Sequence, residues 1–262
     1  SYGNDMEILA RSPLRCVYFN EAIGSNAEAI DFLYANVLER LNNAKNLKSP
    51  TFTPALALHS PYSLHPIMAK KLIELCVNEN LPLSAHFLES PQEKQWLTQQ
   101  DGYFKGFFKR LANIENAKPF YTPQSFLEML LPLQNALSLT HCLQITQKEL
   151  ELCENATLIT CPRSNRLLNN AFLPLEILQN HPTAIGTDGK SSNNNVNLLD
   201  ELRTALYAYP QADIVELSKT LLLGATLYGA RALGLNNGIL AENKSVRFLI
   251  LKSHFFAKIK RI

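Results

Sequence analysis

Residues 183–194 read TAIGTDGKSSNN, an apolar run that leads into one carboxylate, Asp188, and a turn rich in Ser and Asn. The run is typical of a buried strand, and Gly186 and Gly189 let other backbone approach its end. In a barrel of parallel strands, that end is where the chemistry lies. The alternative is that Asp188 caps a helix expected to begin near Leu198.

Three other apolar runs stop at a histidine. They are residues 54–58, 81–85 and 136–140, which stop at His59, His86 and His141. A further run, residues 156–160, ends in CPRSN. One histidine alone is more often a hydrogen-bonded core residue or a surface residue than a ligand. Because parallel strands bring their carboxyl ends to one edge, the three histidines and Asp188 together indicate a site for metal or acid–base chemistry.

The strand-like runs alternate with segments of helical periodicity. Helices are expected over residues 29–41, 67–78, 149–153, 173–179, 198–208 and 214–233, and a further strand is expected over residues 14–19. Six strand–helix units with buried-type strands predict an α/β fold, either a parallel sheet or a (β/α)8 barrel.

Residues 91–125 are long for a connection between a strand and a helix, and they are rich in aromatic side chains. The aromatic residues singled out are Trp96, Tyr103, Phe104, Phe107 and Phe108. One hypothesis is an aromatic lid over a planar substrate. The alternative is a helix that uses these rings for packing.

Residues 238–252 read GILAENKSVRFLILK, which indicates a turn and a β-strand after the last helix of the alternation. We therefore expect a partial barrel domain over residues 1–237 and a fragment of a small β domain over residues 238–262.

The composition is typical of an intracellular enzyme. A chain of 262 residues that is 46% hydrophobic can bury one sizeable core. Its net charge of +2 gives no field for nucleic acid or for an anionic membrane. Five cysteines without CxxC spacing indicate reduced thiols and a cytoplasmic location. The chain begins at a serine, so we expect a segment of a longer protein.

In order, the series HSPYS, HFLES, THCLQ, CPRSN, GTDGKSSNNNVNLLDELR and GATLYGARALGL resembles the amidohydrolase superfamily. The branch it resembles most contains metal-dependent deaminases and chlorohydrolases that act on adenine nucleosides and aromatic amines. The similarity runs from about Leu14 to Leu251. It implies a TIM-like barrel of which this chain holds the third to eighth strands and lacks the first two.

The resemblance implies a role for each of four residues at the strand ends. His86 would be a metal ligand, and Asp188 would be both a ligand and a base. Glu89 would shuttle protons, and His141 would orient the metal-bound water and the developing charge. The cofactor would be one divalent metal ion, zinc first, with iron and manganese as alternatives.

The resemblance also implies substrate contacts from His59 and from a loop after the seventh barrel strand that holds Arg163, Ser164 and Asn165. In the family, an HxH pair on the first strand supplies two metal ligands, and this sequence has no HxH. Because a catalytic zinc site usually has three protein ligands and a water, His86 and Asp188 alone fall short. We therefore expect the function to belong to the intact protein and the isolated segment to be an inactive, open barrel.

HFLESPQEKQWL followed by GYFKGFF resembles the aminodeoxyfutalosine deaminases of bacterial menaquinone synthesis. These enzymes remove the 6-amino group from an adenine joined to a ribose-like, benzoate-bearing group. The alternative is a methylthioadenosine/S-adenosylhomocysteine deaminase, although those enzymes carry arginines where this chain has residues 20–24. An alternative of another class is a catalytically dead binding subunit. The expected partner is a small adenine nucleoside, and a homodimer is left open.

Overall fold

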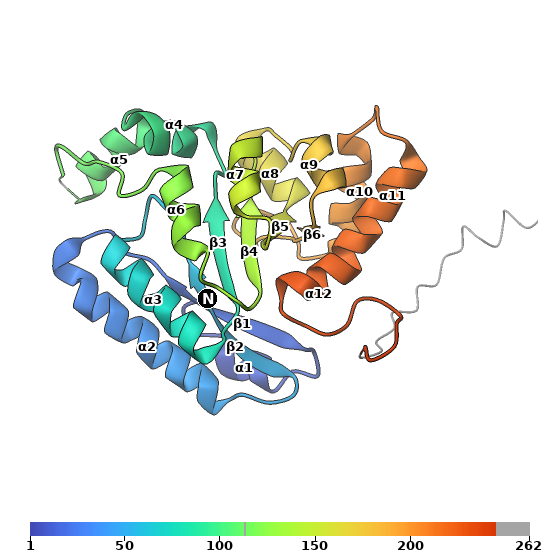
Figure 1. Cartoon of the computed structure of the whole chain (residues 1–262), viewed down its shortest axis with the longest axis horizontal. Coiled ribbons are helices and arrows are strands. Elements are labelled where there is room, and N and C mark those ends of the chain that lie inside the picture. The colour runs from blue at the N-terminus through green and yellow to red at the C-terminus, as the bar shows by residue number, and fades with distance from the viewer. Residues whose placement is uncertain (113, 245–262) are drawn as a thin grey trace, which may run out of the picture.

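The computed structural model describes residues 1–112 and 114–244, and in it six parallel strands form one sheet in chain order (Figure 1). The strands are β1 (Cys16–Ala22), β2 (Phe52–Leu58), β3 (Leu83–Phe87), β4 (Leu137–His141), β5 (Thr157–Thr160) and β6 (Thr183–Ile185). Helices connect each strand to the next, so all six carboxyl ends lie along one edge. The parallel α/β sheet expected from the sequence is confirmed.

The connecting helices lie where the 3.6-residue periodicity places them, with several additions. After α1 (Met6–Ala10) and the 3₁₀ turn η1 (Ala27–Ala29), the first half contains α2 (Ile30–Asn46), α3 (Pro66–Glu79), α4 (Pro91–Gln99), α5 (Tyr103–Ala112) and α6 (Pro123–Leu130). The second half contains α7 (Gln147–Leu152), α8 (Pro162–Asn169), α9 (Leu175–Asn180), α10 (Leu198–Ala208), α11 (Ile214–Leu223), the π-helical turn η2 (Gly224–Tyr228) and α12 (Gly229–Ala232).

The register between neighbouring strands sets the positions of the polar residues at the carboxyl edge. β3 pairs with β4 from Leu83 opposite Leu137 to Phe87 opposite His141. Alternate residues of these strands are buried apolar side chains, which hold the sheet against its helices. A slip of one residue would turn this apolar set to the opposite face, so burial fixes the register and the histidine positions together.

Two expectations from the sequence need correction. The segment that begins at Arg163 is the first turn of α8, not a loop, with Pro162 at a position that favours a helix start. The helix expected over residues 214–233 is interrupted by the π-helical turn η2. The strand expected over residues 238–252 lies largely outside the described residues, and residues 238–244 form bends and turns.

The aromatic segment follows the packing alternative for its most buried members. Trp96 of α4 and Phe104 and Phe108 of α5 lie in the hydrophobic core, and their rings contact one another. Phe107 is half-buried against this core, and Tyr103 is exposed. The helix pair therefore forms a fixed wall instead of a lid made of all five rings.

Among residues 1–112 and 114–244, the helices fall short of the length and hydrophobicity that a bilayer-spanning helix requires. All five cysteines are free thiols, and four of them are buried.

We expect Gly224→Ala to lower the free energy of unfolding by about 1–3 kcal/mol, the usual cost of overpacking. An added Cβ would lie 2.8 Å from the backbone oxygen of Thr183 and 3.0 Å from Cγ1 of Ile185, both on β6. Urea denaturation measures the change. Gly106→Ala is the control, because its Cβ would meet only the flexible tip of Arg110 within α5. Equal stability of Gly224→Ala and wild type would contradict the tight packing of η2 on β6.

Candidate active site at the carboxyl ends of the strands

Three histidine rings form a row across the ends of β2, β3 and β4. The ring centroids of His59 and His86 are 5.4 Å apart, and those of His86 and His141 are also 5.4 Å apart. The rings of His86 and His141 are nearly parallel, with 17° between their planes. The structure thus brings together the three histidines that end apolar runs in the sequence.

His86 is held in a defined tautomer. Its Nδ1 lies 2.7 Å from the backbone oxygen of His59, and because a carbonyl only accepts, Nδ1 must carry the hydrogen. The lone pair of Nε2 is then free for a metal ion. A hydrogen bond from the second ring nitrogen to a carbonyl is the usual support of a histidine that binds metal.

His141 is buried, and its ring is fixed by Asn165 of α8. Its Nδ1 lies 2.8 Å from Oδ1 of Asn165, whose amide nitrogen donates to Oγ1 of Thr160. Nδ1 therefore donates, and Nε2 lies 3.9 Å from a carboxylate oxygen of Glu89. Burial lowers the pKa of His141 against the opposing pull of Glu89, which favours a neutral ring with an accepting Nε2.

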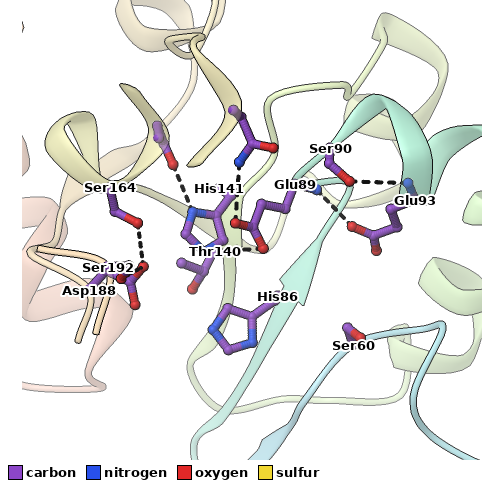
Figure 2. Close-up of polar contacts among 12 residues, drawn as sticks. Ser60, His86, Glu89, Ser90, Glu93, Thr140, His141, Ser164, Asp188 and Ser192 are labelled. Atoms are coloured by element: carbon purple, nitrogen blue, oxygen red, sulfur yellow. Dashed lines mark hydrogen bonds and ion pairs between the residues drawn. The ribbon is translucent and has the colours of Figure 1, made fainter. Parts of the chain in front are cut away.

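Glu89 lies in the turn after β3, beside His141 (Figure 2). Its Oε1 accepts a hydrogen bond from Asn169 at 3.3 Å, and its backbone N–H donates to Oε2 of Glu93 at 2.8 Å. Its side chain stays about one-quarter exposed, so it can exchange protons with the site and with water.

Glu93 accepts the hydrogen bond from the backbone of Glu89 and so supports this turn. Glu93 was not selected in the sequence analysis. It is fully buried, and its Oε1 has no hydrogen-bond partner among the described residues. Burial raises the pKa of Glu93 to about 8, so the carboxyl group is largely protonated at neutral pH. The signal was present: Ser90 and Glu93 have the spacing of a helix capping box.

Asp188 follows β6 and receives three hydrogen bonds. The hydroxyls of Ser164 and Ser192 donate to Oδ2 at 2.5 and 2.6 Å, and the amide of Gly189 donates to Oδ1 at 2.7 Å. Burial opposes ionisation, but the three bonds together hold the pKa of Asp188 below its usual value. Asp188 is therefore an ionised carboxylate at the same edge as His141 (Figure 2).

The alternative role of Asp188 as a helix cap is wrong. The residue that caps α10 is Asn197, whose side chain accepts from the backbone N–H of Leu199. The carboxylate of Asp188 is therefore not used as a helix cap and is available to the candidate site.

The three residues of α8 that were predicted to contact substrate bind other groups of the protein. Ser164 bonds Asp188, and Asn165 bonds His141. The guanidinium of Arg163 donates to Asn195 at 2.7 Å and lies within 4 Å of carboxylates of Asp200 and Glu201 on α10. These contacts position Asp188 and His141 and tie α8 to α10, while a direct contact with substrate stays a prediction for all three residues.

A second group of donors involves Glu21 at the end of β1, which the sequence analysis did not select. A carboxylate oxygen of Glu21 and ring nitrogens of His59 and His86 lie within 4.8 Å of one another. Glu21 follows the rule that identified the histidines, since it is a polar residue at the end of an apolar strand. His59 also contacts Ser63, 2.6 Å from its Nδ1.

The donor chemistry suits a divalent metal of the zinc type, which binds imidazole nitrogen and carboxylate oxygen. Nε2 of His86 is available, and Asp188 is ionised. These two ligands are fewer than the three of a typical catalytic zinc site.

Residues 13–261 match the model of the Amidohydrolase family. The aminodeoxyfutalosine deaminase of a Nitratiruptor species is 39% identical over 246 residues, which are 93% of this chain and 60% of that protein. The adenosine deaminase of Helicobacter pylori is 36% identical over 248 residues, 92% of this chain and 59% of that protein.

The crystal structure of Helicobacter pylori aminofutalosine deaminase in complex with methylthio-coformycin superposes with a TM-score of 0.85 at 32% identity. The match covers 99% of this chain and 66% of that one. The chain thus spans about 60% of the length of the two curated relatives. These similarities confirm the resemblance seen in the motifs.

We expect Glu93→Gln to weaken the pH dependence of folding stability. With a pKa near 8 in the folded chain against about 4.5 when unfolded, Glu93 holds a proton that the unfolded chain releases between these values. The free energy of unfolding should therefore fall as the pH rises from about 5 to about 8.5, by at most a few kcal/mol from this group.

Urea denaturation of both proteins at the two pH values, with a chelator present, measures the difference. Glu74→Gln on the exposed face of α3 should keep the wild-type pH dependence. An identical fall in wild type and Glu93→Gln would mean that Glu93 is ionised in the folded protein throughout.

Proposed function

Because the chain belongs to the amidohydrolase family, we propose that the intact protein is a metal-dependent hydrolase that removes the 6-amino group of an adenine nucleoside. The proposed substrate is aminodeoxyfutalosine, in menaquinone biosynthesis in the cytoplasm. The observation that carries the proposal is the convergence of Glu89, His141, His86 and Asp188 at one edge of the sheet. The identity of 39% to an aminodeoxyfutalosine deaminase supports the choice of substrate.

The alternative substrate is supported by more distant relatives. The 5-methylthioadenosine/S-adenosylhomocysteine deaminase of Pyrococcus furiosus is 28% identical over 203 residues. The catalytically dead binding subunit stays an alternative of another class, and an HxH pair in the intact protein would exclude it.

His86 and Asp188 would hold the metal ion, zinc first and iron or manganese as alternatives, with further ligands from an HxH pair as in the family. When bound, such an ion lowers the pKa of water so that hydroxide forms near neutral pH. The hydrogen bond of His86 to the backbone of His59 keeps Nε2 aimed at the site. The three hydrogen bonds of Asp188 keep its carboxylate ionised and oriented.

The side chains divide the proton transfers between them. Asp188, ionised, accepts a proton from the attacking water. Glu89 donates a proton to a ring nitrogen, so that the carbon bearing the amino group becomes electrophilic, and it then takes back a proton from the hydroxyl added at that carbon. Asp188 passes the proton that it took from water to the leaving nitrogen, which departs as ammonia. Nε2 of His141 accepts a hydrogen bond from the attacking water and so holds its oxygen in place at that carbon.

Substitution of either proposed metal ligand should remove metal and activity together. We expect His86→Ala and Asp188→Ala in the full-length protein to lose bound metal, measured by elemental analysis, and deamination, measured by the loss of adenine absorbance. His181→Gln, at the end of α9, is the control that should retain both. Stoichiometric metal in purified His86→Ala would refute its assignment.

Glu89→Gln separates proton transfer from metal binding. The amide keeps the size and the hydrogen bond with Asn169 but cannot carry the proton. Turnover should fall by at least ~10², the usual scale for a general acid–base group, with metal content unchanged. Glu128→Gln, on α6, is the matched control. Turnover within a few-fold of wild type would remove Glu89 from the mechanism.

A further inference from the structure

A cavity of about 300 Å³ lies beside the candidate site, at the same edge of the sheet. Its walls come from the turns after β1 and β2, from α4 and α5, and from the segment before α6. Its principal lining residues are Ser25, Tyr62, Trp96, Phe108, Lys118 and Phe120. None of these residues has a role in the proton transfers described above.

Tyr62 connects the cavity to the row of histidines. Its ring meets that of His59 edge-on, with centroids 5.8 Å apart, and it packs on Phe104 of α5 at 4.3 Å. Burial raises the pKa of Tyr62 to about 12, so the ring is a neutral phenol at physiological pH. A ligand whose reacting end lies by His86 would therefore reach the cavity by extending one aromatic ring beyond His59.

The lining of the cavity is mainly aromatic and carries a single cation. Four aromatic residues line the cavity, and among the described residues Lys118 is the one charged residue in its lining. Lys105 and Lys109 of the neighbouring helix pair with Asp101 and Glu115. In the part of the chain that the structure describes, Lys118 has no such acidic partner within 4 Å. An aromatic slot with one cation suits a flat ring that bears a negative charge.

We propose that this cavity is the subsite for a planar aromatic carboxylate at the far end of the nucleoside substrate, with Lys118 pairing with the carboxylate. The inference rests on the proposed function and identifies the residues that select the substrate's tail. Residues 20–24 contain no arginine that could pair with a substrate carboxylate. In this proposal the pairing cation is instead Lys118, in the segment between α5 and α6. A small neutral tail, such as a methylthio group, would leave Lys118 unused.

Selectivity between two nucleosides tests the proposal in the full-length enzyme. Lys118→Gln should lower kcat/KM for aminodeoxyfutalosine by about tenfold, the scale of one lost charged hydrogen bond, and that for 5′-deoxyadenosine by less than about twofold. Phe120→Ala should raise KM selectively for the aromatic substrate, at little cost in stability because Phe120 is 45% exposed.

Lys109→Gln is the control on the neighbouring helix, since Lys109 pairs with Glu115 and does not line the cavity. An equal loss with both nucleosides in Lys118→Gln, or no loss with either, would overturn the subsite.

A binding measurement separates this inference from the proposed function. Trp96 lines the cavity, so its fluorescence should respond saturably to benzoate and less to the neutral isostere benzamide. The response should vanish in Trp96→Phe, and the preference for benzoate should vanish in Lys118→Gln. If the wild type deaminates neither nucleoside yet shows this preference, the proposed function fails and the aromatic-acid site stands. Equal responses to benzoate and benzamide would overturn the site.

Discussion

The pairing of β3 with β4 determines how Glu89 and His141 meet in the candidate site. The ladder that sets Phe87 opposite His141 continues past the strands, since Cys142 donates to the backbone of Phe87 and Gln144 donates to that of Leu88. His141 and Cys142 both adopt left-handed backbone conformations, which cost energy and persist only where neighbouring bonds impose them. These two bonds hold the turn after β4 against the turn after β3, so Glu89 and His141 meet.

The first turn of α8 organises the other half of the site. Successive side chains of a helix point about 100° apart, so three consecutive residues can contact groups in three different directions. Arg163 reaches α10, Ser164 reaches Asp188, and Asn165 reaches His141. One helical turn thus orients two of the four candidate catalytic side chains and attaches them to the outer layer. Loss of the helix start at Pro162 would disturb both at once.

The sequence predicted the sheet and the convergence of four residues because both follow from short-range patterns. Buried strands show as apolar runs, and parallel pairing brings their ends together, so His59, His86, His141 and Asp188 could be placed beforehand. The start of α8 could not, because Pro162 after a strand reads equally well as a loop.

The burial of Glu93 and the cavity residues Ser25, Tyr62, Lys118 and Phe120 were missed for another reason. Their roles depend on contacts across the chain, such as that between Tyr62 and Phe104, and these contacts have no periodicity. The packing of Trp96 and Phe108 was one of two readings that composition left open.

Helix α4 has a consequence for how the protein can change over time. Glu93 and Trp96 lie three residues apart, hence on the same side of the helix, and one supports the turn of Glu89 while the other lines the cavity. A mutation that shifts α4 to admit a bulkier ligand would also move Glu89, the proposed acid–base group. Residues of the segment 114–120 also line the cavity, and among the described residues this segment makes no hydrogen bond to Glu89. Drift in substrate range should therefore accumulate there, while α4 stays nearly invariant among descendants.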